Sequence, residues 1–526
     1  MDIPENQIAN TDIPKKHWLI PMFVGIALLI IVGVAYFILG KTAPVITKTS
    51  IPQNEDNKHQ PIVLLLVEKN IAEALKYELD TYSKDVLNEL GFRTVTKLVE
   101  PTDDVLNLKE YVLNTYRNDT LSGVLIVGNV PTGYFYHPDY VDANSVFNSE
   151  GLILGDSIYQ DIFGACIYST ERKAFSYKDT LCQPGGIIIP PYWVGRLTPN
   201  SSNQDSVTLL KNYFKRNHDY RSGQFSYQKN VLIYTPLFSD RQPKDMQGEV
   251  AVMQDFSLFG RYKTGYQTNQ LNFIDPWDVK SDQKYLTELN RSHNYEIILF
   301  NGHGAPTFHQ KNLKPENIGN ASTFLGLFLS CSVGRFTTKD YLAGQYLFTD
   351  SLVVIANSVP VFAASQAPRD ESHFLTSGKP VFETLKISPT GLAQNILGDP
   401  TLRMRYDNTK KENEAFIDVD RRALVFSDAE HEIPFKIKNT GTKPLYFTIK
   451  PRFNTQKQDR TVLDSFSAMT GGPNSLSIPP QDETQATLMI YPWDQVTAGT
   501  YHGSVFILSN DTNDPVIEIP FEIQKK

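Results

Sequence analysis

The sequence has very little cysteine: three cysteines in 526 residues are too few for a disulfide framework. Cys166 and Cys182 can pair in an oxidising compartment, or both can stay reduced, and the sequence leaves these alternatives open. Pairing would leave Cys331 as the odd cysteine, whereas without it all three cysteines are unpaired thiols. A thiol left over in this way is a candidate for chemistry, because a thiolate is a strong nucleophile.

A basic surface and a nucleotide-binding glycine motif are also missing. The formal net charge is -8, and lysine and arginine are dispersed along the chain, which argues against nucleic acid as a partner. No Walker or dinucleotide glycine pattern follows a predicted strand in the first half. With 41% apolar and 21% charged residues the composition is that of an ordinary globular protein, and the length predicts two to four domains.

Charged residues are absent from a long stretch near the N-terminus, residues 18–40. About 20 apolar residues suffice to cross a bilayer as a helix, whereas a cleavable signal peptide has an apolar region of roughly 7 to 15 residues. We therefore expect a transmembrane signal anchor in contact with the lipid bilayer. Lys15 and Lys16 precede it, which favours a cytoplasmic tail at 1–17 and an extracytoplasmic location for all that follows. The polar residues 41–60 are typical of a linker.

The next part of the chain alternates strand and helix signals. The predicted elements are a strand at 61–67, a helix at 71–91, a strand at 92–99, a helix at 105–117 and a strand at 122–131. This order predicts a parallel sheet covered by helices. A second α/β block follows, so we expect an N-terminal α/β subdomain at 61–227 and a second α/β subdomain at 228–406.

Two apolar runs of the second block end in reactive residue types. The first, 295–300, is followed by Asn-Gly-His-Gly, which places His303 between two glycines, and the second, 323–330, ends at Cys331. If the two runs are neighbouring parallel strands, His303 and Cys331 emerge at the same edge of the sheet, where ligands collect. An imidazole beside a thiol favours the thiolate or gives a proton to a leaving amine.

Each of these signals also has an ordinary explanation. A histidine in a glycine-rich turn is often only a turn residue, and a cysteine that ends an apolar strand is often a small buried hydrophobe. The flanking glycines allow sharp turns and the close approach of a substrate backbone, and their N–H groups can hold an oxyanion. The two strand-end signals together, with matching chemistry, make a catalytic pair a reasonable hypothesis.

The blocks "IILFNGHG" and "LGLFLSCS" resemble the His-Gly and Ser-Cys blocks of the caspase-like cysteine peptidases, the group of caspases, legumain, clostripain and gingipains. Within this group the chain most resembles the gingipain family, because "GVLIVGNVP", "YWVGRL", "LAGQYLF" and "NILGDPTLRM" occur in the same order. The likeness covers about residues 61–405 and continues into an immunoglobulin-like module. It implies a caspase-like parallel-sheet catalytic region in two α/β subdomains.

The resemblance also implies catalytic roles. Cys331 would be the nucleophile that forms a thioester acyl-enzyme, and His303 would protonate the departing amine. The backbone N–H groups of Gly304 and Cys331 would bind the oxyanion. The family carries a supporting glutamate where this chain has Leu237, so the nearest candidate for a supporting acid is Asp240, although an acidic residue in a polar turn is often only solvated.

Specificity and cofactors follow from the same resemblance. Gingipains select a basic residue before the scissile bond through an acidic pocket residue, and Asp245 and Glu249 lie in the corresponding region. Both are also typical of ordinary helix-surface charges. Calcium is common in the family, but the sequence has no acidic loop with binding spacing, so we expect no metal site and no cofactor.

Residues 415–526 carry short alternating strands separated by turn signals, which predicts a seven-stranded sandwich. This part resembles the immunoglobulin-like module attached to gingipain-type peptidases. Its fold assigns it no function, and it is either a spacer or a binding module.

Taken together, these features predict a membrane-anchored, extracytoplasmic cysteine endopeptidase that acts on protein or peptide substrates, with a basic P1 preference as a further hypothesis. Two alternatives remain open. A catalytically inactive peptidase fold would serve as a surface scaffold or adhesin, and a transpeptidase would resolve the thioester with an amine instead of water.

Overall fold

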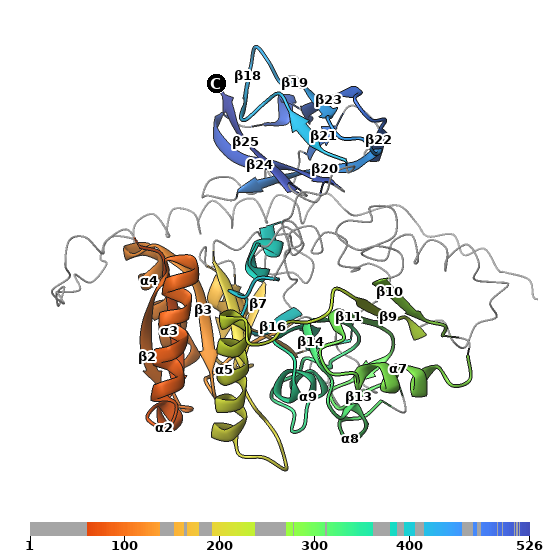
Figure 1. Ribbon diagram of the computed structural model, residues 1–526. Coiled ribbons are helices and arrows are strands. Elements are labelled where there is room, and N and C mark those ends of the chain that lie inside the picture. Colours follow the sequence, from red (N-terminus) through yellow and green to blue (C-terminus); the bar gives the residue numbers. More distant parts are fainter. Residues whose placement is uncertain are drawn as a thin grey trace, which may run out of the picture. The chain divides into compact units, whose positions relative to one another are not determined.

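The structure of the chain is a computed structural model (Figure 1). It describes residues 60–136, 152–161, 166–177, 192–236, 270–276, 278–310, 313–360, 379–386, 394–404, 415–454, 467–470, 475–491, 493–496, 498–509, 511, 514 and 516–526. The predicted membrane anchor at 18–40, the tail before it and nearly all of the linker after it lie outside these residues. Among the described helices, none is both long and apolar enough to cross a membrane.

One ten-stranded sheet runs through both α/β blocks (Figure 1). Its strands, in spatial order, are β10 (Leu271–Ile274), β9 (Val231–Tyr234), β11 (Tyr295–Asn301), β14 (Thr323–Leu329), β15 (Val353–Asn357), β16 (Gln394–Gly398), β8 (Trp193–Leu197), β3 (Leu121–Val127), β1 (Ile62–Glu68) and β2 (Arg93–Val99). Pairing is parallel from β10 to β15 and from β8 to β2, whereas β16 is antiparallel to β15. The predicted α/β class is therefore confirmed, and a single sheet joins the two predicted subdomains.

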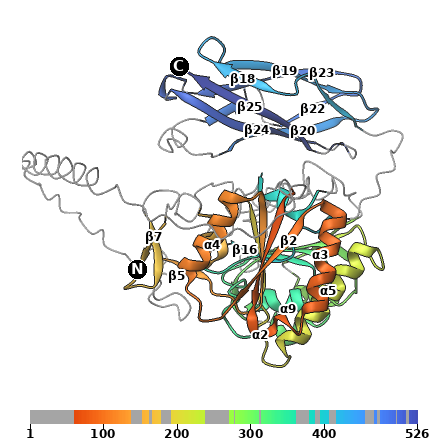
Figure 2. The same ribbon diagram turned by 90° about the vertical axis from the view of Figure 1, so that its left-hand side faces the viewer.

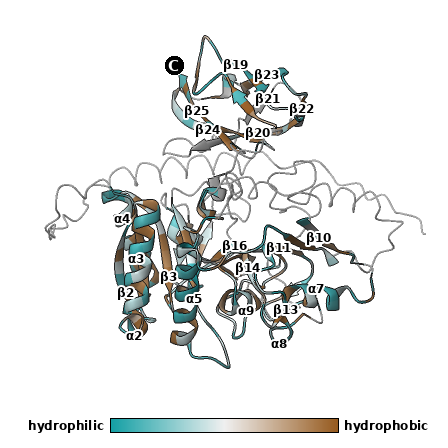
Figure 3. Ribbon diagram, viewed as in Figure 1, coloured by the Kyte–Doolittle hydropathy of each residue, from teal (hydrophilic) through white to brown (hydrophobic). Residues whose placement is uncertain are grey.

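Helices cover both faces of the sheet because the central strands are apolar on both sides. In β1, for example, Val63 and Leu65 face the layer of α3 and α5, whereas Leu64 and Leu66 face the layer of α4. The helices of the α/β part are α2 (Lys69–Ala72), α3 (Lys76–Leu90), α4 (Val105–Asn118), α5 (Ser206–Ser222), α7 (Ser281–Leu289), α8 (Pro315–Ile318) and α9 (Leu342–Thr349), with short 3-10 turns η3 (Asp156–Gln160) and η8 (Val381–Lys386). Figure 3 shows the apolar strands between the more polar helices.

Local signals explain where these helices begin and end. The carboxylate of Asp104 accepts a hydrogen bond from the Leu106 N–H at 2.6 Å and caps α4, and Asp205 caps α5 in the same way. Helix α3 ends at Gly91, whose φ of +71° is the left-handed conformation that glycine adopts without strain. The elements predicted between residues 61 and 131 are thus present, with the first helix divided into α2 and α3.

A small four-stranded sheet, in the order β5-β4-β7-β6, follows β3. Its strands are β4 (Gly133–Tyr136), β5 (Leu152–Gly155), β6 (Cys166–Ser169) and β7 (Ala174–Tyr177). Cys166, at the start of β6, is disulfide-bonded, whereas Cys331 is a thiol. This outcome selects the paired alternative for Cys166; Cys182 lies outside the described residues.

The C-terminal part is a β-sandwich of two sheets that share one apolar core (Figure 2). One sheet has the order β17-β19-β23-β21 and the other β18-β25-β24-β20-β22. Their bounds are β17 (Ile417–Val419), β18 (Leu424–Ser427), β19 (Glu432–Asn439), β20 (Leu445–Asn454), β21 (Ser467–Thr470), β22 (Ser475–Ile478), β23 (Glu483–Tyr491), β24 (Gly499–Ser509) and β25 (Val516–Lys525), with a 3-10 turn η9 (Trp493–Gln495). The predicted sandwich is present, but the predicted number of seven strands is too low.

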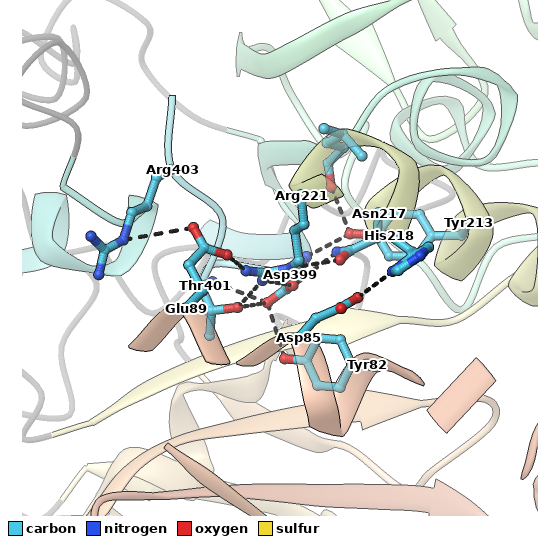
Figure 4. Close-up of polar contacts among 11 residues, drawn as sticks. Tyr82, Asp85, Glu89, Tyr213, Asn217, His218, Arg221, Asp399, Thr401 and Arg403 are labelled. Carbon is cyan, nitrogen blue, oxygen red and sulfur yellow. Dashed lines mark hydrogen bonds and ion pairs between the residues drawn. The ribbon is translucent and has the colours of Figure 1, made fainter. Parts of the chain in front are cut away.

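A buried polar cluster, which we call the Asp399 cluster, fixes the end of β16 against α3 and α5 (Figure 4). The Asp399 carboxylate, which is 0% exposed, accepts hydrogen bonds from Asn217 and Arg221 of α5 at 2.9 and 2.7 Å and from Tyr82 of α3 at 3.2 Å. The N–H and hydroxyl of Thr401 add two more, at 3.0 and 2.7 Å. A buried charge is tolerated when it is paired and hydrogen-bonded in this way, so the Gly-Asp-Pro-Thr segment is a structural clamp.

Candidate active site

The ends of β11 and β14 lie side by side. The two strands pair in parallel with Asn301 opposite Leu329, and every residue of both strands is buried. Because the last residues of the two parallel strands are paired with each other, the chain segments that carry His303 and Cys331 leave the sheet at the same edge. The neighbouring parallel strands required by the sequence argument are therefore present.

The two strand ends pack so closely that residue 304 has no room for a side chain. A Cβ built on Gly304 would lie 2.9 Å from the carbonyl oxygen of Cys331 and 2.8 Å from Cβ of Ser330. A Cβ on Gly302 would lie 2.9 Å from Cγ of Pro236, which follows β9. Neither glycine has a positive φ, so neither makes the sharp turn that we expected. Glycine is needed at these positions because neighbouring loops pack closely against them.

The exposures of the two residues fit their expected chemistry. His303 is exposed and Cys331 is half-buried. The backbone of His303 is held in place because its carbonyl oxygen accepts a hydrogen bond from the Gln310 N–H at 2.9 Å. Within the part of the chain that the structure describes, the His303 ring has no hydrogen-bond partner. The imidazole is thus able to reach a substrate, and the thiol is partly shielded from water.

Left-handed backbone is concentrated in the loops around this edge. Ser332, Gln310 and Asp340 have φ values of +59°, +47° and +54°, although none of them is a glycine. Such residues cost on the order of 1–3 kcal/mol each and persist where the surrounding structure holds them, often at functional sites. Ser332 directly follows Cys331, and its N–H donates to the Val359 carbonyl at 3.0 Å. Cys331 therefore lies beside a strained turn between strand and loop.

Arg196 of β8 anchors the loop that follows Cys331. Its side chain is 1% exposed and donates to both carboxylate oxygens of Asp156, each at 2.7 Å. The guanidinium also lies over the ring of Phe336, 4.3 Å from the ring centroid. Asn200, just after β8, donates to the Phe336 carbonyl at 3.3 Å. Residues of the first α/β block thus hold the loop that carries the candidate nucleophile.

A two-stranded hairpin, β12 (Gly304–Ala305) and β13 (Phe308–His309), covers the same edge. His309 is completely buried, with its ring stacked on Phe300 at a centroid distance of 3.8 Å and edge-on to Phe328. Burial lowers the pKa of His309 to about 3, so its ring stays neutral in the folded protein at neutral pH. His309 is therefore part of the buried aromatic packing beneath the hairpin.

Buried polar atoms without a partner also gather at this edge. Among the described residues they include Asn301 Oδ1, Ser330 Oγ, Asn357 Oδ1, Gln310 Nε2 and both ring nitrogens of His309. A buried group left without a hydrogen bond costs about 1–3 kcal/mol, so a concentration of them needs a reason. Ordered water or a bound substrate would satisfy those that face the site.

The remaining predicted site residues lie outside the part of the chain that the structure describes. Asp240, the candidate supporting acid, and Asp245 and Glu249, the candidate pocket residues, all lie in the segment 237–269, outside the described residues. In the described ranges no group of three or more His, Cys, Asp and Glu side chains is arranged to hold a metal ion.

Two residues of the site were missed by sequence reasoning. Arg196 has a usable signal, because a charged residue inside the apolar strand "WVGRL" must find a buried partner. His309 has no such signal. Its burial depends on aromatic side chains from β11, β14 and α9, and only the fold brings these together.

Comparisons with known proteins add little to this geometry. No family model and no curated protein matches the chain. Among solved structures, the Pseudomonas aeruginosa CupB2 chaperone is 16% identical with a TM-score of 0.17, over 20% of this chain and 55% of that one. A PapD-like domain of human CEP192 is 12% identical with a TM-score of 0.18, over 23% of this chain and 92% of that one. A protein of unknown function from Porphyromonas gingivalis W83 is 16% identical with a TM-score of 0.18, over 26% of this chain and 60% of that one.

The matched region spans only about half the length of the CupB2 chaperone. TM-scores of 0.17 and 0.18 are too low to assign this chain to the fold family of any of these proteins.

Proposed function

We propose that this protein is a cysteine endopeptidase with a caspase-like catalytic fold. The observation that carries the proposal is the close approach of the Gly304 backbone to Cys331. A Cβ built on Gly304 would lie only 2.9 Å from the carbonyl oxygen of Cys331. An exposed histidine and a half-buried thiol follow the ends of the neighbouring parallel strands β11 and β14. The resemblance of the two sequence blocks to those of gingipain-type peptidases supports the same activity.

In the proposed mechanism Cys331 attacks the carbonyl carbon of a peptide bond and forms a thioester. His303 protonates the departing amine, and water then hydrolyses the thioester to release the acyl group. Backbone N–H groups of Gly304 and Cys331 stabilise the negative charge on the carbonyl oxygen during attack. Asp240 would support the histidine, and Asp245 or Glu249 would select a basic P1 residue.

The protein would act outside the cytoplasm, anchored in the membrane by residues 18–40. The disulfide at Cys166 supports this location, because structural disulfides are common in oxidising compartments and rare in the cytosol. The lysines that precede the apolar stretch favour the same orientation.

Activity-based labelling of the full chain in detergent tests the proposal. The probes are acyloxymethyl ketones that carry Arg, Lys, Asp or Asn at the P1 position. We expect labelling of the unchanged protein, with Arg or Lys preferred, no labelling of Cys331→Ala, and much slower labelling of His303→Ala. His502→Ala, which changes another exposed histidine, is the matched control and should label normally.

Labelling that survives Cys331→Ala would contradict the assignment. If no probe labels the folded protein, this result would instead favour the hypothesis of an inactive scaffold. Among the described residues the His303 ring has no hydrogen-bond partner, which also favours that hypothesis. The masses of peptide products then separate hydrolysis from transfer to an amine.

A further inference from the structure

A hollow lies in the α/β part, and neither His303 nor Cys331 lines it. This cleft of about 760 Å³ is formed by the loop after β8, the first half of α5, the β12–β13 hairpin, α8 and α9. Helix α9 packs against both α5 and α8, so the walls come from neighbouring elements (Figure 1). Its volume lies within the range of about 300–1,000 Å³ that is typical of small-ligand sites.

Primary amides are the most frequent kind of polar side chain in the lining, and we call this hollow the amide cleft. The amides are those of Asn200, Asn203, Gln204, Asn212, Asn320 and Gln345. Each amide offers two donors and one acceptor oxygen. Within the described residues the side chains of Gln204, Asn212 and Asn320 make no hydrogen bond to the protein, so all their donors and acceptors face solvent or ligand.

The charges of the amide cleft cancel. Lys314 and Lys339 are balanced by Glu316 and Asp340. Asp340 is already engaged, because its carboxylate accepts hydrogen bonds from the N–H of Ser202, at 2.7 Å, and from the Ser202 hydroxyl. A cleft without net charge is poorly suited to a phosphate, a nucleic acid or a strongly charged peptide.

An aromatic side chain completes the lining. Phe308 of β13 is half-buried, whereas Tyr341 and Phe348, which also line the cleft, are buried. A pyranose ring has an apolar C–H face that can pack on an aromatic ring and a rim of hydroxyl groups that both donate and accept hydrogen bonds. An extended peptide would instead need a strand edge to pair with, and β13, only two residues long, is the sole described strand that contributes to the wall.

We propose that the amide cleft, with its volume of about 760 Å³, binds an uncharged oligosaccharide. The hydroxyl groups bond to the amides of the loop after β8, of α5 and of the segment after α8, and one ring packs on Phe308. This site does not depend on peptidase activity, because the candidate catalytic residues lie outside its lining.

Saturation-transfer NMR on the full chain, in a detergent without a sugar head group, tests the proposal with maltotriose, cellotriose and chitotriose. We expect at least one of them to bind. Asn212→Ala and Asn320→Ala should each weaken binding about threefold to tenfold, which is the change in affinity expected for the loss of one neutral hydrogen bond. Phe308→Ala should weaken binding further. Asn107→Ala removes an exposed amide from α4, outside the cleft, and should leave binding unchanged.

Two results would overturn the proposal: none of the three trisaccharides binds, or the bound sugar is insensitive to the cleft variants. Selective binding of the uncharged peptide acetyl-Gly-Asn-Ser-Gln-Gly-amide in place of the sugars would also overturn it and assign the cleft to polypeptide. Cys331→Ala should bind sugar normally, so failure of the proposed peptidase activity and failure of this site are distinguishable.

Discussion

His309 links the fold beneath the candidate active site to pH. Its ordinary pKa is 6.5, and burial lowers the pKa to about 3 in the folded protein. Between these values the unfolded chain binds a proton at this position that the folded chain does not, so the free energy of unfolding falls as the pH drops below 6.5. The loss from this residue is up to about 1.4 kcal/mol for each pH unit.

We therefore expect His309→Phe, which keeps an aromatic ring on Phe300, to flatten the pH dependence of stability between pH 6.5 and 4. Urea unfolding at several pH values measures this. His502→Phe, at an exposed position, is the control and should keep the original slope. An equal slope in His309→Phe and the unchanged protein would show that His309 is not the group responsible.

Gly304 supports a second residue-level prediction. The added methyl group of Gly304→Ala would meet the Cys331 carbonyl oxygen and Ser330 Cβ at less than 3.0 Å, so the two strand ends must move apart. Misplacement of reacting groups by about 1 Å can cost on the order of a hundredfold in rate. We expect probe labelling of Cys331 to slow at least tenfold, in a protein that remains folded.

Gly91→Ala is the matched control for this substitution. Gly91 also has a constrained backbone, but a Cβ there meets nothing within 4 Å, so only the strain of its φ of +71° is added. It should lower stability by about 1 kcal/mol and leave the labelling rate unchanged. Equal labelling rates in Gly304→Ala and Gly91→Ala would refute the importance of the close contact.

The sequence allowed His303 and Cys331 to be predicted because both follow long apolar runs, and burial of such runs in parallel strands brings their ends together. The contact of Arg196 with Phe336 could not be predicted, because it joins residues 140 positions apart through a fold that local patterns do not specify. The catalytic roles of His303 and Cys331 stay predictions, as does the supporting acid, since Asp240 lies outside the described residues.

At the scale of elements, the Asp399 cluster determines how β16 is held against α3 and α5 (Figure 4). Asp399→Ala would leave the side chain of Arg221, only 4% exposed, without its fully buried carboxylate partner, with only Glu89 still paired to it. Removing one partner of a buried ion pair typically costs about 3–5 kcal/mol. We expect a loss of stability of this size in urea unfolding.

Asp219→Ala provides the comparison on the same helix. Asp219 pairs with Lys215 across one turn of α5, and the Lys215 side chain is 73% exposed. Such pairs contribute about 0.3–0.5 kcal/mol, so this variant should be nearly neutral. Similar losses of stability in Asp399→Ala and Asp219→Ala would mean that the Asp399 cluster does not hold β16 against α3 and α5.

Individual elements were easier to predict than their pairing. Strands such as β1 and helices such as α5 carry their own signals, namely apolar runs, an N-cap aspartate and a terminal glycine. The antiparallel placement of β16 and the two extra strands of the sandwich depend on partners far away in the sequence. These features follow from side-chain packing between elements, which periodicity alone does not encode.

At the scale of the whole molecule, the apolar stretch 18–40 predicts stable membrane association. We expect the full chain, expressed in cells, to sediment with membranes and to resist extraction by alkaline carbonate, and a chain that begins at residue 57 to stay in the supernatant. Recovery of the full chain in the carbonate supernatant would rule out a spanning helix and leave peripheral binding as the explanation.

The α/β part and the sandwich have separate apolar cores. The core of the sandwich contains only residues from 415 onward, and the cores around the ten-stranded sheet contain only residues up to 404. Each part therefore buries enough of its own apolar surface to unfold as a unit, and we expect two calorimetric transitions.

A chain that ends at residue 410 separates the contributions of the two parts. It retains His303, Cys331, Arg196 and the whole Asp399 cluster, so the loops of the candidate site keep all the contacts that hold them. One calorimetric transition should disappear, while the other keeps its midpoint within about 3 °C, which corresponds to no more than about 2 kcal/mol for a part of this size. Probe labelling of Cys331 should stay within about twofold of the full chain. Loss of labelling with the remaining transition intact would mean that the sandwich supplies part of the site itself.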